Sequence, residues 1–219
     1  MKIMKLPEDN YLQQGRRKAL MELLRQKGIK EAVLEVMMKV PRHYFFPSTF
    51  DVHAYDDKAF PIAADQTISM PYTVAFQTQL LEIKPLEKIL EIGTGSGYQA
   101  AVLAASGARV FSIERQKQLF DSTKLLLQNI GYSDIKCFYG DGYKGLPTYA
   151  PFDKIIITAA APIIPEDLKQ QVKVGGWIVI PVGDEVTTMK KVTRISETEF
   201  VEEDFHEFRF VPMLGGKAK

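Results

Sequence analysis

From Lys88 onward, short apolar runs take turns with segments that permit helix, and this alternation constrains the fold more than any other feature of the chain. The apolar runs read KILEIG, RVFSIE, IKCFYG, KIIITA and GWIVIPVG, separated by stretches such as YQAAVLAAS, RQKQLFDSTKLLLQNI and PEDLKQQV. Strands that alternate with helices form a parallel sheet covered on both faces. The pattern predicts the α/β class, with a doubly wound, mostly parallel sheet.

The segments on either side of this region follow different patterns. Before it, apolar residues recur at helical spacing from Tyr11 to about Met38, with Gly28 as a break between two amphipathic helices. The run 47–66 looks irregular, and a further helix is expected over Val74–Leu81. After it, TTMKKVTRIS and FVEEDFHEFRFV alternate polar and apolar residues, as half-exposed antiparallel strands do. We therefore expect a single domain over 1–219, with an N-terminal helical layer and substrate-side segment (1–82), an α/β core (83–186) and an antiparallel C-terminal edge (187–219).

Composition excludes several classes of protein. The 219 residues carry a formal net charge of +1, which argues against a nucleic-acid partner. No apolar run approaches the ~20 residues needed to span a bilayer, and the start MKIMKLPEDNYLQQ lacks the apolar middle of a signal peptide. We expect a cytoplasmic monomer with no membrane contact. The only cysteine is Cys137 and the histidines are scattered, so neither an internal disulfide nor a metal site is expected.

A glycine loop, ILEIGTGSGYQ, stands where the first strand of the core should end and its first helix begin. In such sheets ligands bind at this edge, and Gly93, Gly95 and Gly97 let the backbone turn sharply and approach a ligand closely. A dinucleotide fingerprint requires its third glycine one position later, where Tyr98 stands, and no Gly-Lys-Ser/Thr of a P-loop follows. The spacing favours an adenosine ligand without phosphates over NAD or FAD, although a tight turn with nothing bound has the same sequence.

Acidic residues at the ends of the next strands support the ligand. Glu114 follows the glycines by about 20 residues, where a carboxylate can accept hydrogen bonds from both ribose hydroxyls. Asp141 and Gly142 follow the third strand, where a carboxylate and an amide can address an adenine. Each alone also fits a surface glutamate or an Asp-Gly turn, but three successive strand ends together favour a nucleoside pocket. S-adenosylmethionine fits, because its cationic sulfonium is compatible with Glu91 and the acidic rim.

Six segments of the chain resemble, in the same order, those of the protein-L-isoaspartate O-methyltransferases. The resemblance extends from about Val40 to Gly216, and its most discriminating element is QTISMPY. It implies a Rossmann-like methyltransferase fold that uses S-adenosylmethionine and releases S-adenosylhomocysteine. The segments are VPRHYFFP, AYDDKAFPI, QTISMPY, KILEIGTGSGYQAAVLA, FDKIIITAAAPIIPEDLKQQVKVGGWIVIPVG and FRFVPMLGG.

The resemblance also implies a reaction and its residues. The enzyme would methylate the free α-carboxyl of isoaspartyl residues in damaged proteins and peptides, and the ester would collapse to a succinimide and so start repair. Ser69 would be the active-site serine. Cofactor contacts would come from Glu91, Gly93, Thr94, Gly95, Ser96, Gly97, Glu114, Asp141 and Gly142, and substrate contacts from Thr67, Ile68, Pro71, Pro212 and Met213.

The chemistry makes modest demands on the protein. An α-carboxyl has a pKa of about 3.5, so the acceptor is already an anion at neutral pH and needs alignment rather than a base. Ser69 can donate a hydrogen bond to that carboxylate, and no histidine or lysine lies nearby in sequence to make it a nucleophile. The residues alone favour a local hydroxyl-to-backbone bond of Ser69 or Thr67, and only the resemblance reverses that interpretation. FRFVPML fits either an ordinary edge strand or an edge to which a substrate peptide adds.

Two other functions remain open at this point. The same cofactor pocket would serve a methyltransferase acting on a small molecule or on RNA. RNA is disfavoured by the near-neutral charge and by TAAAP, which stands where an Asn/Asp-Pro-Pro-Tyr motif would be expected. From a different class, the chain could bind S-adenosylmethionine without turnover, against which the intact strand-end acids and QTIS argue.

Overall fold

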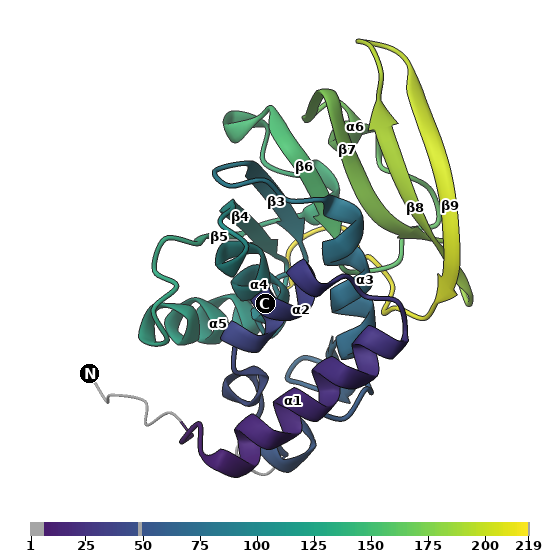
Figure 1. Ribbon diagram of the computed structural model, residues 1–219. Helices are drawn as coiled ribbons and strands as arrows, with labels where there is room; N and C mark the ends of the chain where they lie inside the picture. Colours follow the sequence, from purple (N-terminus) through teal and green to yellow (C-terminus); the bar gives the residue numbers. More distant parts are fainter. Residues whose placement is uncertain (1–6, 48–49, 219) are drawn as a thin grey trace.

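A seven-stranded sheet in the order β5-β4-β3-β6-β7-β8-β9 organises the computed structural model, which describes residues 7–47 and 50–218 (Figure 1). Within this sheet, strands β3 to β7 pair in parallel, and β8 and β9 are added antiparallel at one edge. The predicted doubly wound sheet with an antiparallel C-terminal edge is confirmed. The strands are β3 (Lys88–Ile92), β4 (Arg109–Glu114), β5 (Lys136–Tyr139), β6 (Phe152–Ile157), β7 (Val172–Val182), β8 (Thr187–Arg194) and β9 (Phe200–Phe208).

Helices cover both faces of the sheet because successive strand residues point to opposite sides. On β3, Ile89 packs in the core shared with α4 (Tyr98–Ala105) and α5 (Lys117–Asn129), whereas Leu90 packs in the core on the other face. That second face is covered by α6 (Glu166–Lys169) and by the short helices η3 (Gly142–Lys144) and η4 (Pro147–Tyr149). The carboxyl ends of β3 and β4 therefore lie between two hydrophobic layers.

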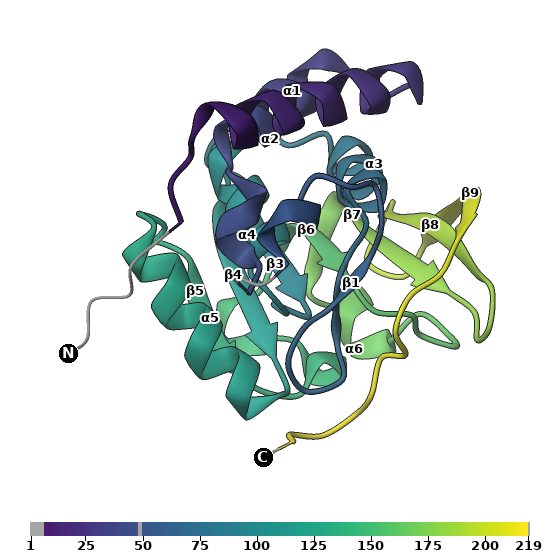
Figure 2. The same cartoon turned by 90° about the horizontal axis from the view of Figure 1, so that it is seen from below.

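An N-terminal layer of helices packs outside α4 (Figure 2). It contains α1 (Tyr11–Gln26), α2 (Glu31–Lys39) and α3 (Pro71–Leu81). Asn10 caps α1 by accepting a hydrogen bond from the Gln13 amide at 3.0 Å, and Gly28 turns the chain with a φ of 87°. The predicted pair of amphipathic helices is confirmed. No helix within residues 7–47 and 50–218 is long and apolar enough to cross a membrane.

The segment before the core departs from its prediction in two places. Helix α3 begins at Pro71 rather than Val74, because a proline fits the first helical position, where its fixed φ suits the helix and its missing N–H costs nothing. The run 47–66, which was expected to be irregular, contains β1 (Phe60–Pro61), which pairs with β2 (Thr67–Ile68) just after the run. Two-residue strands are too short to show a periodicity. The run also contains η2 (Asp51–His53), preceded by η1 (Arg42–Phe45), while residues 48 and 49 lie outside the described residues.

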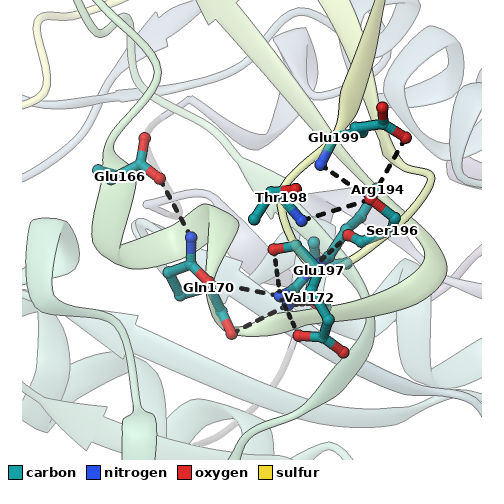
Figure 3. A network of polar contacts seen from close by, with 8 residues as sticks. All are labelled: Glu166, Gln170, Val172, Arg194, Ser196, Glu197, Thr198 and Glu199. Carbon is teal, nitrogen blue, oxygen red and sulfur yellow. Dashed lines mark hydrogen bonds and ion pairs between the residues drawn. The ribbon is translucent and has the colours of Figure 1, made fainter.

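A buried arginine, Arg194, links β8 to β7 at the end of the sheet where β7 begins, opposite the carboxyl ends of β3 and β4 (Figure 3). Arg194 donates hydrogen bonds to the Val172 carbonyl at 2.8 Å and to the Glu197 carboxylate at 3.0 Å. Gln170 contributes a carbonyl and a side-chain oxygen to the same guanidinium. The network joins the end of β8 to the start of β7.

Candidate active site

A cavity that is partly open to solvent lies at the carboxyl ends of β3 and β4. Four segments that are distant in sequence line it: residues 66–69, residues 92–96 of the glycine loop, residues 113–115 after β4, and residues 211–214 of the C-terminal tail. The strand ends singled out by the sequence thus open into one common cavity.

The glycine loop is packed too tightly for side chains. Gly93 has a φ of 97°, and a Cβ there would lie 2.5 Å from the Thr158 hydroxyl oxygen. Gly97 has a φ of 86°, and a Cβ there would lie 2.7 Å from a methyl carbon of Thr123. Only glycine satisfies both the backbone angle and the space. Gly93, Thr94, Gly95 and Ser96 line the cavity, whereas Gly97 is buried where α4 begins.

Glu114 joins the end of β4 to the glycine loop. Its Oε2 accepts a hydrogen bond from the Gly95 amide at 2.9 Å, and its Oε1 accepts one from the Gln116 amide at 2.8 Å. The side chain lines the cavity and is otherwise buried. Each carboxylate oxygen retains acceptor capacity, so the geometry is compatible with a bound diol.

Glu91, a predicted cofactor residue, does not line the cavity. The alternation along β3 turns it toward the α4 face, where it is fully buried and accepts a short hydrogen bond from Ser112. The Ser112 hydroxyl in turn lies 2.6 Å from that of Thr94. Burial raises the pKa of Glu91 to about 8, with the Ser112 bond opposing and Glu114 adding to the shift. The negative charge that we expected Glu91 to present is thus largely neutralised at neutral pH.

Asp141 and Gly142 follow the end of β5, and only one of them lines the cavity. Gly142 is buried and lines the cavity. The Asp141 carboxylate accepts a hydrogen bond from the Tyr143 amide at 3.0 Å, which caps η3, and Asp141 does not line the cavity. Both residues nevertheless flank the same strand end as predicted.

A second cavity, of about 470 Å³, adjoins the first. It is lined by the segment around β2 and the start of α3, by Val186 and by residues 207–211 at the end of β9. Four residues line both cavities: Thr67, Ser69, Thr158 and Val211. Ser69 therefore lies at the junction between a cavity beside the glycine loop and a cavity bounded by the C-terminal strand.

The Ser69 hydroxyl makes no hydrogen bond to any residue in the described part of the chain, and neither does that of Thr67. The alternative of a local hydroxyl-to-backbone bond is therefore not realised. The Ser69 carbonyl, in contrast, accepts a hydrogen bond from Arg42 at 2.7 Å. The peptide is fixed while the hydroxyl remains available to a ligand.

The predicted substrate residues do not all gather at one place. Thr67 lines both cavities, and Ile68 is buried and lines only the first. Pro71, the first residue of α3, lines neither. Pro212 and Met213 line the first cavity but not the second. The tail is thus a wall of the cavity beside the glycine loop.

The tail is held in place by main-chain hydrogen bonds. The Ala160 amide donates to the Val211 carbonyl at 2.8 Å, and the Met213 amide donates to the Ala160 carbonyl at 2.6 Å. Tyr143 donates its hydroxyl to the Met213 carbonyl at 3.1 Å, and Arg115 donates to the Gly216 carbonyl at 3.1 Å. These bonds occupy part of the FRFVPML edge that we considered for strand addition.

Several lining residues were not predicted. Tyr98 and Gln99 begin α4 directly after the last glycine of the loop. Thr158 directly follows β6, so the rule that ligands bind at strand ends also applied to it. Arg115 and Leu214 line the cavity without a comparable signal. No histidine lines either cavity, and no group of three His, Cys, Asp or Glu within residues 7–47 and 50–218 is arranged to hold a metal ion.

Comparison with known proteins agrees with this geometry. The model of the family described as Protein-L-isoaspartate(D-aspartate) O-methyltransferase matches residues 15–218. The protein-L-isoaspartate O-methyltransferase of Christiangramia forsetii is 57% identical over 211 residues, covering 96% of this chain and 99% of the relative. That of Cytophaga hutchinsonii is 51% identical over 210 residues, covering 95% of each chain.

A solved structure supports the fold. A Plasmodium falciparum protein in complex with S-adenosyl-L-homocysteine superposes with a TM-score of 0.81 at 22% identity, covering 90% of this chain and 98% of that one. At this identity the likeness concerns the fold alone. With the family model and the relatives, it leads to one conclusion: the chain belongs to the protein-L-isoaspartate O-methyltransferase family.

Proposed function

We propose that this chain transfers a methyl group from S-adenosylmethionine to the free α-carboxyl of L-isoaspartyl residues in damaged proteins and peptides. Family membership supports the reaction. The observation that carries it for this chain is the position of Ser69, whose hydroxyl has no partner among residues 7–47 and 50–218 and lies where the two cavities meet. One cavity would hold the cofactor and the other the acceptor peptide, so methyl transfer would occur at Ser69.

The residues of the first cavity fit the cofactor. Glu114 would accept hydrogen bonds from the ribose hydroxyls, since each of its oxygens already accepts one amide and can accept another donor. Gly142 and the neighbouring Asp141 would contact the adenine, and the loop from Gly93 to Gly97 would adjoin the amino-acid portion. When bound, S-adenosylmethionine supplies an electrophilic methyl group on a cationic sulfonium.

Glu91 would act through its neighbours rather than by contact. It accepts a hydrogen bond from Ser112, which pairs with Thr94 in the cavity wall. These hydrogen bonds would fix the Thr94 side chain and hence the glycine loop. The proposal therefore gives Glu91 a positioning role and leaves direct cofactor contact to Glu114.

Ser69 would orient the acceptor. The substrate carboxylate is already ionised at neutral pH, which is consistent with cavity walls that contain no histidine in the described chain. A hydroxyl that donates one hydrogen bond to the carboxylate selects which oxygen faces the methyl carbon. Alignment of this kind can supply up to roughly 7 to 11 kcal/mol of the barrier. Thr67 and Met70 would bound the acceptor peptide.

We further propose that the enzyme works as a single domain and a cytoplasmic monomer, on proteins rather than on nucleic acid. The formal net charge of +1 supports the last point, because nucleic-acid binding relies on positive charge. A methyltransferase for a small molecule or RNA is the remaining alternative.

One labelling experiment separates these functions. The protein is incubated with methyl-labelled S-adenosylmethionine and, in parallel, an isoaspartyl peptide, its normal aspartyl twin and an RNA pool. We expect label in the isoaspartyl peptide only. Equal labelling of the aspartyl twin would refute the repair reaction, and labelling of RNA alone would establish the alternative.

A further inference from the structure

We propose that Arg42 is a positioning residue for methyl transfer, because it holds the main chain of Ser69 from behind the junction of the two cavities. The inference rests on the proposed function, since it assigns Arg42 a part in placing the acceptor. Arg42 lines neither cavity, so its action passes through Ser69 and Tyr98.

The guanidinium connects three segments that are distant in sequence. Arg42 belongs to η1, its Nε donates to the Ala54 carbonyl at 2.9 Å, and its Nη2 donates to the Ser69 carbonyl at 2.7 Å. The carbon of the guanidinium lies 4.7 Å from the centre of the Tyr98 ring, which is part of the cavity wall. One side chain thus contacts the acceptor segment and the start of α4 together.

The buried environment of Arg42 makes its positive charge unfavourable in free energy. Arg42 is fully buried, and among residues 7–47 and 50–218 no carboxylate lies within ion-pair distance of it. Its Nη1 is buried without a partner. Burial lowers the pKa of Arg42 to about 10, so the side chain remains charged at neutral pH. Burying a charge without a paired carboxylate costs free energy, and the hydrogen bonds to the Ala54 and Ser69 carbonyls give a reason for the arginine.

The acceptor segment depends on a small number of such attachments. Ser69 stands between β2 and the first residue of α3, and Met70 has extended rather than helical geometry. The next attachment is the Tyr72 amide, which donates to the Asp57 carboxylate at 2.8 Å. Without Arg42 the peptide between Ser69 and Met70 would lose its only hydrogen bond to a side chain in the described chain, and the hydroxyl would lose its fixed position.

The test uses Arg42→Met, which removes every donor, and Arg42→Lys, which keeps a charge and one donor group. Arg17→Met is the matched control, because Arg17 is also a buried arginine but contacts Asp9 and Tyr55 instead. We measure kcat and KM with an isoaspartyl peptide, the Kd of S-adenosylhomocysteine, and deuterium exchange of the peptide covering residues 66–72.

We expect Arg42→Met to lower kcat by roughly 10- to 100-fold, as displacement of a reacting group by about 1 Å does. Arg42→Lys should lower kcat less than Arg42→Met does. In both Arg42 variants the Kd of S-adenosylhomocysteine should stay within about twofold of wild type, and deuterium exchange in residues 66–72 should increase. Arg17→Met should leave kcat and this exchange unchanged. Unchanged kcat in both Arg42 variants, or equal losses in Arg17→Met, would overturn the inference.

The failure of this inference is distinguishable from that of the proposed function. If the wild-type protein methylates no isoaspartyl peptide, the proposed function fails, and the positioning role of Arg42 fails with it. If the wild-type enzyme is active and exchange in residues 66–72 is unaltered in both Arg42 variants, only the inference fails.

Discussion

The carboxylate of Glu114 accepts a hydrogen bond from the amide of Gly95 at 2.9 Å, so the end of β4 holds the glycine loop directly. The glycine loop and Glu114, which are about 20 residues apart in sequence, are thus joined directly. The same carboxylate lines the cavity, where it can also accept from a ligand. Loop geometry and cofactor recognition are therefore coupled through one side chain.

Replacing Glu114 by glutamine tests this coupling. Glutamine offers one oxygen instead of two, so it cannot accept from the amides of both Gly95 and Gln116 and also from two ribose hydroxyls. Hydrogen bonds to charged groups contribute about 1.5–3 kcal/mol, so the Kd of S-adenosylhomocysteine should rise roughly 10- to 100-fold in calorimetry. Glu203→Gln, on the exposed side of β9, is the control. An unchanged Kd in Glu114→Gln would exclude Glu114 from cofactor binding.

Substitution of Gly93 by alanine tests the close packing of the loop. Gly131 is a matched site, because its φ of 91° resembles the 97° of Gly93 but a Cβ there would meet nothing within 4 Å. Both variants share the backbone strain, and only Gly93→Ala adds the collision with Thr158. Its free energy of unfolding should fall by about 1–3 kcal/mol more than that of Gly131→Ala in urea denaturation. Equal losses would show that the collision is relieved without cost.

The raised pKa of Glu91 predicts a pH dependence of stability. Between the ordinary pKa of 4.5 and about 8, the folded protein keeps a proton that the unfolded chain has released. Unfolding free energy should therefore decline as pH rises through this window, by up to about 1.4 kcal/mol per pH unit, and the contribution is complete below the lower value. Glu91→Gln mimics the protonated form and should flatten this part of the curve. Parallel curves for the two proteins, from about pH 5 to about pH 9, would contradict a protonated Glu91.

The sequence predicted those parts of the fold in which a periodic pattern decides the structure. The alternation from Lys88 onward predicted the parallel core, and the polar-apolar alternation after it predicted β8 and β9. The motifs also predicted that Glu114, Gly142 and the glycine loop would share a cavity. These residues sit at strand ends, and a parallel sheet brings its strand ends together whatever the details of packing.

The parts that sequence did not predict depend on contacts between distant segments. Glu91 faces away from the cavity because of strand alternation, although it directly precedes the loop in sequence. The contact of Arg42 with Ser69 joins positions 27 residues apart and has no local signal. The start of α3 at Pro71 follows a local rule, since a proline fits the first helical position, and the prediction of Val74–Leu81 did not apply that rule.

The placement of the acceptor carboxylate at Ser69 is tested most directly by single-turnover methyl transfer by Ser69→Ala, measured with labelled S-adenosylmethionine and an isoaspartyl peptide. Ser122→Ala, which alters an exposed serine on α5, is the control. We expect a transfer rate lower by roughly 10- to 100-fold in Ser69→Ala, equivalent to one hydrogen bond to a charged group, with cofactor Kd within about twofold of wild type. An unaltered transfer rate, or a loss of cofactor binding that accounts for the whole defect, would contradict the placement of the acceptor carboxylate at Ser69.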